Sequence, residues 1–168
     1  MWPEEVHREL KAAGVRMVGY VPDAGHKRLI ELCRADNSMR AVVLSTEEEG
    51  IGLAAGAWLG GQRCVLLMQS SGVGNIINVL GTVQVCRFPL LIIVTMRGEQ
   101  GEFNPWQVPM GRATPQVLEA MGMSVRRASA ADEVAPLVAG ALKGENATAV
   151  LISQSVVGIK SFQEQRTQ

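Results

Sequence analysis

The chain has 168 residues, and its 16 basic and 16 acidic side chains balance to a formal net charge of zero. Nothing in this balance points to the strongly basic surface with which proteins bind nucleic acids or anionic membranes, and no apolar run is long enough to span a bilayer. The length is typical of one domain, so we expect a single unit over residues 1–168. The N-terminus has no basic segment followed by an apolar one, so we predict no secretory signal and a cytoplasmic protein.

Apolar segments with two different periods alternate along the chain. In chain order they predict a helix at 2–13, a strand at 15–21, a helix at 26–34, a strand at 41–44, a helix from 47, a strand at 64–68, a helix through 76–83, a strand at 88–94, a helix at 115–122, a strand at 124–127, a helix at 132–142 and a strand at 147–152. Alternation of this kind predicts an α/β fold in three layers, with a six-stranded parallel sheet between helices on both faces. The fourth strand is the most apolar and should lie centrally, whereas the polar end at 160–168 should be loosely held.

Three consecutive acids, Glu47, Glu48 and Glu49, lie where the strand at 41–44 turns into a helix. Acids in the first turn of a helix complement its macrodipole, and this interpretation fits all three. The alternative is a ligand site, because ligands of open α/β sheets bind at the carboxyl ends of the strands. Local pattern leaves both interpretations open.

The helix that begins at these acids repeats glycine every four residues, at Gly52, Gly56 and Gly60. A glycine inside a helix costs roughly 1 kcal/mol relative to alanine. We therefore expect a protein chain or a cofactor to pack unusually close to this ridge.

The turn after the strand at 64–68 contains Gly72 and Gly74, which suggest a phosphate cradle at a helix N-terminus. The match is weak, because Ile77 replaces the third glycine of a dinucleotide fingerprint and the P-loop lysine is absent. Ser70 and Ser71 lack the Gly-x-Ser-x-Gly setting of a serine nucleophile, so we interpret them as turn and capping groups.

The segment 95–112 has no helical or strand period, and a loop of this length in a compact chain is usually functional. Its aromatic residues, Phe103 and Trp106, predict an ordered loop. Thr114 is predicted to cap the next helix, with Pro115 at its first position. The three cysteines, at 33, 64 and 86, are an odd number in apolar segments and predict reduced, buried thiols; with two histidines besides, no metal site is expected.

Several motifs together resemble one family over nearly the whole chain. They are Glu47 nine positions before Gly56 on an alanine-rich helix, the run Met68-Gln69-Ser70-Ser71-Gly72-Val73-Gly74-Asn75, the segment Arg87-Phe88-Pro89-Leu90-Leu91 and the triplet Arg97-Gly98-Glu99. The combination is similar to the pyrimidine-binding domain of thiamine-diphosphate enzymes, which has a flavodoxin-like fold. Within that superfamily the chain most resembles the alpha subunits of sulfopyruvate decarboxylases, followed by phosphonopyruvate decarboxylases.

The resemblance implies that Glu47 is the catalytic acid, which hydrogen-bonds N1′ of the aminopyrimidine ring of thiamine diphosphate. Glu48 and Glu49 are then ordinary first-turn acids. A carboxyl group held partly away from water suits this role, because it can share the proton of the ring nitrogen. The other residues implied to line the cofactor pocket are Gln69, Ser70, Ser71, Gly72 and Asn75.

The substrate implied by the resemblance is a small 2-oxo acid with a second acid group, which needs cationic or amide donors. Arg97 is the first candidate because its guanidinium is a planar fork, although a surface arginine is the alternative. Asn104 and Arg112 are further candidates on the same loop. Asp23 lies in a turn similar to the family's Val-Pro-Asp-Ser, with Ala24 in place of the serine, and could instead cap the following helix.

The second domain of the family carries a Gly-Asp-Gly motif and a later asparagine that hold Mg²⁺ and the diphosphate, and neither motif is found in this sequence. The resemblance therefore implies a separate beta subunit that binds them, with the alpha chain inactive alone and self-associating within a larger assembly. The glycine ridge is a candidate for the close subunit contact. No nucleic-acid or membrane partner is expected.

The implied activity is the decarboxylation of sulfopyruvate to sulfoacetaldehyde and carbon dioxide, or that of phosphonopyruvate. Two hypotheses from other classes stay open. One is a non-catalytic regulatory or scaffold subunit that keeps the same fold. The other is an independent flavodoxin-like module that binds a flavin or a nucleotide.

Overall fold

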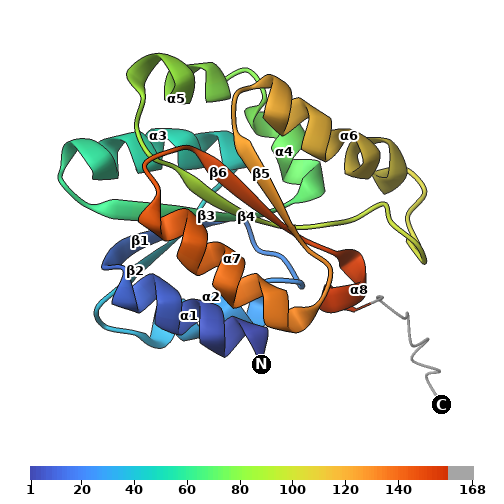
Figure 1. Cartoon of the computed structure of the whole chain (residues 1–168), viewed down its shortest axis with the longest axis horizontal. Coiled ribbons are helices and arrows are strands. Elements are labelled where there is room, and N and C mark those ends of the chain that lie inside the picture. Colours follow the sequence, from blue (N-terminus) through green and yellow to red (C-terminus); the bar gives the residue numbers. More distant parts are fainter. Residues whose placement is uncertain (159–168) are drawn as a thin grey trace.

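The computed structural model describes residues 1–158 and has one parallel sheet in the order β2-β1-β3-β4-β6-β5 (Figure 1). The strands are β1 (Val15–Tyr20), β2 (Arg40–Val43), β3 (Arg63–Gln69), β4 (Leu91–Thr95), β5 (Ser124–Ala128) and β6 (Thr148–Ile152). Each predicted strand is present within a few residues of its expected bounds, and β4 is central as predicted. The predicted loose segment 160–168 lies outside the described residues.

Helices cover both faces of the sheet, which confirms the predicted three layers (Figure 1). One face is covered by α1 (Trp2–Ala12), α2 (Lys27–Ala35) and α7 (Ala131–Lys143). The other is covered by α3 (Glu47–Leu59), α4 (Ser70–Ile76), α5 (Leu80–Cys86) and α6 (Gln107–Ala120). A short α8 (Gln154–Val157), which the sequence did not predict, follows β6.

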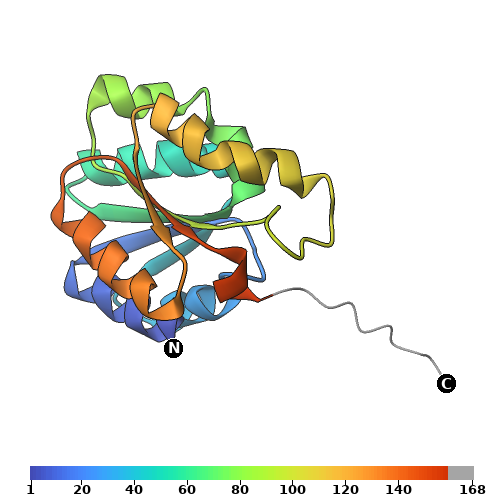
Figure 2. The same cartoon turned by 45° about the vertical axis from the view of Figure 1, so that its right-hand side comes forward.

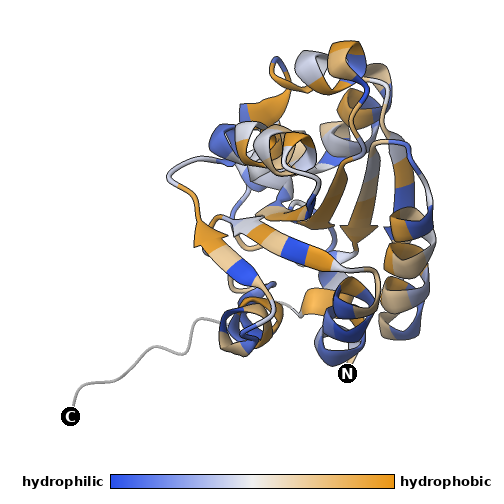
Figure 3. Ribbon diagram, turned by 90° about the vertical axis from the view of Figure 1, so that its left-hand side faces the viewer, coloured by the Kyte–Doolittle hydropathy of each residue, from blue (hydrophilic) through white to orange (hydrophobic). Residues whose placement is uncertain are grey.

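The apolar runs of the strands form the centre of the molecule, as their hydrophobic colouring in Figure 3 shows. All residues of β4 and β6 are buried, because each of these inner strands has helices on both sides. Burying such side chains stabilises the fold by roughly 1.5–3 kcal/mol each. Alternate residues face opposite sides, so that Ile92 and Val94 pack under α3–α6 and Leu91 and Ile93 under the α1, α2 and α7 layer.

The helix predicted through 76–83 is two helices in the structure, and it begins earlier than expected. The turn predicted after the strand at 64–68, with Gly72 and Gly74 in it, is wrong, since α4 already begins at Ser70. Between α4 and α5 the backbone hydrogen bonds span three residues, as in a 3₁₀-helix, instead of four. The amides of Gly81 and Thr82 donate to the carbonyl oxygens of Asn78 and Val79. Glycines at 72 and 74 indicated a turn, but Gly72 is needed inside the helix for a contact described below.

The prediction that Thr114 caps a helix is also wrong, because α6 begins seven residues earlier, at Gln107. Thr114 is buried within α6, and its hydroxyl donates to the carbonyl oxygen of Met110 at 2.7 Å. Tertiary packing decides the boundary: Gly111, Thr114 and Leu118 form a buried stripe. A Cβ on Gly111 would lie 2.0 Å from the carbonyl oxygen of Arg97, so α6 is fixed against the end of β4.

The irregular segment is therefore shorter than predicted and runs from Met96 to Trp106. Figure 2 shows it projecting on the same side of the molecule as α8. Phe103 and Trp106 are exposed at 62% and 71% of their surface. None of the helices described for residues 1–158 is long and apolar enough to cross a membrane.

The cysteines are free, as predicted, but they differ in burial. Cys33 is buried, Cys64 is partly buried, and burial raises the pKa of both thiols to about 12. Cys86 is exposed at the end of α5, so the expectation that all three are buried is wrong.

Candidate active site

Polar side chains gather at the carboxyl edge of the sheet, where the parallel strands end. From β1 the chain adds β2 on one side of the sheet and then β3 on the other, so the strand order switches direction between β1 and β3. Ligands of open α/β sheets bind in the crevice at such a point. The groups delivered there by five strands are Asp23 after β1, Glu47 after β2, Gln69 at the end of β3, Thr95 at the end of β4 and Gln154 after β6.

Glu47 is distinguished from its two neighbours by burial, since it is only 8% exposed whereas Glu48 and Glu49 are exposed. The hydroxyl of the N-cap residue Thr46 accepts from the amide of Glu48 at 3.1 Å. The carboxylate of Glu49 turns back and accepts from the amide of Ser45 at 2.8 Å. These two interactions satisfy the start of α3, so Glu47 is not needed as a capping group.

The carboxylate of Glu47 lies against the beginning of α4. Its Oε2 accepts a hydrogen bond of 2.8 Å from Nδ2 of Asn75. Its Oε1 lies where any residue other than glycine at position 72 would place its side chain, since a Cβ on Gly72 would be 2.3 Å from this oxygen. Within residues 1–158, Oε1 accepts no hydrogen bond, so this buried acid keeps one oxygen available for a ligand.

Asp23 does not cap α2, contrary to one of the two interpretations of its sequence position. The N-cap residue of α2 is His26, without a side-chain cap bond. The oxygens of Asp23 instead accept from Nε2 of Gln69 at 2.5 Å and from Oγ1 of Thr95 at 2.6 Å. Burial would raise the pKa of Asp23, but the neighbouring His26, together with Thr95 and Gln69, holds this pKa well below its usual range.

His26 is fully buried beside this acid, with Nδ1 at 3.4 Å from Oδ2 of Asp23. Neither ring nitrogen has a hydrogen-bond partner of good geometry among residues 1–158. The ring of Trp2 meets it edge-on, with centroids 6.4 Å apart. Sequence analysis did not select His26 or Thr95, although Thr95 ends a strand at the edge where ligands bind.

Asp23 and Gln69 form part of the wall of a cavity of about 170 Å³, the size of a small metabolite. Thr95, Arg97 and Gln154 also line it, together with Ala24, Gly25, Met96, Val157 and Gly158. The predicted cofactor residues Ser70 and Ser71 lie beside it with their hydroxyls engaged. Ser70 Oγ accepts from the amide of Arg97 at 2.9 Å, and Ser71 Oγ donates to Oε1 of Gln69 at 3.2 Å.

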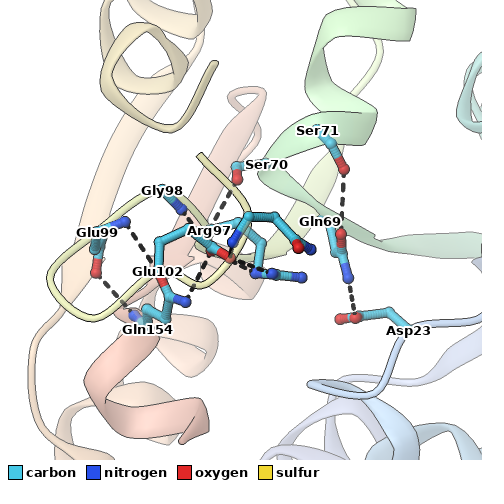
Figure 4. A network of polar contacts seen from close by, with 10 residues as sticks. Asp23, Gln69, Ser70, Ser71, Arg97, Gly98, Glu99, Glu102 and Gln154 are labelled. Atoms are coloured by element: carbon cyan, nitrogen blue, oxygen red, sulfur yellow. Dashed lines mark hydrogen bonds and ion pairs between the residues drawn. The ribbon is translucent and has the colours of Figure 1, made fainter. Parts of the chain in front are cut away.

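Arg97, the first substrate candidate, lines the cavity, and its guanidinium is paired (Figure 4). Nε donates to Oε2 of Glu102 at 2.7 Å, and Nη2 donates to Oε1 of the same carboxylate. The side chains are only 12% and 1% exposed, so this is a buried ion pair and not a solvated surface arginine. Its hydrogen bonds to Glu102 raise the pKa of Arg97.

The two other substrate candidates on this segment do not line the cavity. The backbone amide of Asn104 donates to Oε1 of Glu102, so this residue helps to hold the loop. Arg112 is exposed on α6. Glu102 and Gln154, which the sequence analysis missed, contribute more to this site than either candidate.

The buried ion pair predicts acid sensitivity. Hydrogen bonds from Arg97, with further ones from Gly98, Asn104 and Gln154, hold the pKa of Glu102 well below its usual range despite burial. In the unfolded chain this carboxyl binds its proton near pH 4.3, so its contribution to stability is complete above that pH and is lost as the pH falls below it. We expect the melting temperature, followed by circular dichroism, to fall more steeply between about pH 5 and 3 for the natural chain than for Glu102→Gln. Parallel curves would contradict this.

A cofactor-binding α/β domain is thus indicated by the fold and by the buried acid at its carboxyl edge. The family model described as "Thiamine pyrophosphate enzyme, N-terminal TPP binding domain" matches residues 4–123. The sulfopyruvate decarboxylase subunit alpha of Methanothermobacter thermautotrophicus is 37% identical over 157 residues, which are 90% of this chain and 95% of that protein. The chain therefore belongs to the thiamine pyrophosphate enzymes, in the family of sulfopyruvate decarboxylase alpha subunits.

Two longer proteins add to this comparison. The sulfopyruvate decarboxylase of Methanosarcina acetivorans is 34% identical over 122 residues, which are 72% of this chain and 31% of that protein. A solved 2-oxoglutarate:ferredoxin oxidoreductase from Magnetococcus marinus superposes with a TM-score of 0.72 at 13% identity, covering 99% of this chain and 34% of its own. At that identity the superposition supports the fold alone.

The residues present fit the aminopyrimidine end of thiamine diphosphate. That ring offers N–H donors, and the open Oε1 of Glu47 is a buried acceptor at the carboxyl edge of the sheet. Gly72 leaves the carboxylate room at the start of α4, and Asn75 fixes its orientation. In residues 1–158 no three His, Cys, Asp or Glu side chains gather as a metal site.

Proposed function

We propose that the chain is the alpha subunit of a thiamine-diphosphate-dependent decarboxylase that converts sulfopyruvate to sulfoacetaldehyde and carbon dioxide. The observation that carries the proposal is the buried carboxylate of Glu47, with one oxygen held by Asn75 and the other open. The relatives named sulfopyruvate decarboxylase subunit alpha, which match 79–90% of this chain, support the choice of substrate.

In this proposal Glu47 holds the proton at N1′ of the aminopyrimidine, and Asn75 keeps the carboxylate turned toward that atom. When bound, thiamine diphosphate supplies the electron sink for decarboxylation. Burial suits Glu47 to this task, since a hydrogen bond between a carboxylate and a protonated ring is stronger where water is excluded. Gln69 lines the 170 Å³ cavity, Ser71 donates to its side chain, and Ser70 accepts from the amide of Arg97 in the same lining.

The 2-oxo acid binds in that cavity, with Arg97 donating to one of its acid groups. Asp23, which also lines the cavity, is ionised and accepts from Gln69 and Thr95. Because Asp23 repels an additional negative charge, the cavity favours a sulfonate, which carries one charge, over a fully ionised phosphonate, which carries two.

A separate beta subunit completes the site by binding the diphosphate and Mg²⁺. In Methanosarcina acetivorans the matched residues are only 31% of the corresponding protein, which is more than twice as long as this chain and so supports a second chain for the remaining part. The ridge on α3 is available for a close contact, since a Cβ on Gly52 or Gly56 would meet no atom within 4 Å in residues 1–158. Self-association of the alpha chain is part of the proposal.

The test is reconstitution with a candidate beta chain that carries the diphosphate-binding and Mg²⁺-binding motifs, in thiamine diphosphate and Mg²⁺. We expect carbon dioxide release from sulfopyruvate by the mixture and none by either chain alone. Phosphonopyruvate and pyruvate serve as comparison substrates, each expected to give a kcat/KM at least about tenfold lower, a difference of roughly 1.4 kcal/mol. An assembled complex that binds the cofactor but decarboxylates no 2-oxo acid would instead indicate a scaffold subunit.

A further inference from the structure

Glu102 is the most heavily hydrogen-bonded side chain of the site, and the proposed reaction does not yet use it. Five hydrogen bonds end on its carboxylate (Figure 4). Two come from Arg97, two from the backbone amides of Gly98 and Asn104, and one from Nε2 of Gln154 at 2.9 Å. A carboxylate with 1% exposure and this many donors has one fixed position.

The donors come from segments far apart in the chain. Gly98 and Asn104 lie on either side of Glu102 in the loop, whereas Gln154 begins α8. Gln154 is itself held by the loop through two hydrogen bonds with Glu99. Its side-chain Oε1 accepts from the backbone amide of Glu99 at 3.0 Å, and its backbone amide donates to Oε2 of Glu99 at 2.8 Å. Glu102 therefore fixes both the loop and the wall of the cavity to which Gln154 belongs.

Arg97 is bonded to one carboxylate and lines the same cavity as another, Asp23. Glu102 accepts from Nε and Nη2, and the negative charge of Asp23 acts on the same guanidinium electrostatically. Within residues 1–158, Nη1 makes no hydrogen bond. A guanidinium released from Glu102 would turn toward Asp23 and close the cavity that both residues line.

We propose that Glu102 is a positioning residue: it holds Arg97 away from Asp23 and presents the remaining Nη1 donor to an acid group of the substrate. This inference rests on the proposed function, because it assigns substrate binding to the same cavity. Glu102 neutralises most of the charge of Arg97, so Arg97 acts as an oriented hydrogen-bond donor more than as a free cation. The chemical class of ligand is a small carboxylate or sulfonate.

The first experiment compares Glu102→Gln with Glu99→Gln in the reconstituted holoenzyme. Both acids lie on the same loop and both bond Gln154, but only Glu102 contacts Arg97. For Glu102→Gln we expect KM for sulfopyruvate to rise by about tenfold or more with kcat within roughly threefold, the pattern of lost binding that is equal in ground and transition states. For Glu99→Gln both constants should stay within about twofold.

A second measurement separates positioning from a merely structural role. In the Arg97→Gln background, Glu102→Gln should raise KM by no more than about twofold, because its main effect passes through Arg97 and only the loosened loop remains. An increase in that background as large as in the natural background would overturn the proposal, as would an unchanged KM for Glu102→Gln alone.

The third measurement needs no activity. Hydrogen exchange of the isolated chain should show faster exchange at the amides of Gly98 and Asn104 in Glu102→Gln than in the natural chain. Unchanged protection would show that Glu102 does not hold the loop and would overturn the proposal. If the unchanged reconstituted enzyme decarboxylates no 2-oxo acid, the proposed function fails and Glu102 has no such role, even where the exchange result stands.

Discussion

Glu47→Gln in the reconstituted enzyme is expected to lower kcat by about 100-fold to 10,000-fold, the range typical of a lost general acid or base. The amide has the shape of the carboxylate and can still accept from Asn75, but it cannot hold a proton at the ring nitrogen. Assembly and the melting temperature should change little, because the fold needs the volume of this side chain more than its charge. Steady-state decarboxylation and gel filtration measure the two effects separately.

The matched control is Glu48→Gln, one position further along the same helix. Glu48 is exposed, and its side chain makes no hydrogen bond within residues 1–158, so its kcat should stay within about twofold of the natural enzyme. Full activity of Glu47→Gln, or equal losses in both variants, would remove Glu47 from the mechanism. A loss of folded protein in Glu47→Gln alone would point to a structural acid.

Gly72→Ala is expected to damage the same site through packing. The new Cβ would lie 2.3 Å from Oε1 of Glu47, a distance that requires either the carboxylate or the start of α4 to move. Strain of this kind costs roughly 1–3 kcal/mol, partly offset by the better helix propensity of alanine. We expect denaturant unfolding to show a lower stability, and calorimetry on the assembled enzyme to show thiamine diphosphate binding weakened by at least about tenfold.

Gly74→Ala provides the control within the same helix. Its Cβ would meet only the sulfur of Met110, at 3.5 Å, which is an ordinary contact. The isolated chain should therefore gain up to about 1 kcal/mol, with cofactor affinity unchanged. Equal behaviour of the two variants would mean that the space at Gly72 is not what seats Glu47.

The strands were predictable because their signal is local. The run Leu91–Thr95 is buried throughout, and its apolar residues indicate a central strand without knowledge of any neighbour. The start of α6 was not predictable in this way, since Thr114 and Pro115 form a strong local start signal. The contact of Gly111 with Arg97, which extends the helix backwards, is tertiary.

In the candidate site, too, local features were predictable and those that depend on tertiary contacts were not. Local pattern placed Glu47 at the carboxyl edge but could not separate it from its neighbours, because the distinction depends on the bonds of Thr46 and Glu49 and on the gap above Gly72. The family resemblance selected Glu47. Glu102 was missed because one of its partners, Gln154, is 52 residues away, and no spacing rule joins them.

The uncovered glycines of α3 would connect assembly to catalysis in the proposed enzyme. Gly52 and Gly56 weaken this helix by about 2 kcal/mol together, and nothing within residues 1–158 packs on them in return. The same helix begins at Glu47, so fraying of α3 would loosen the acid at its first turn. In the proposed assembly, a chain that covers this ridge would exclude water from the helix backbone and steady the acid. Docking would then order Glu47 for its proposed role as well as supply the proposed diphosphate and Mg²⁺ ligands.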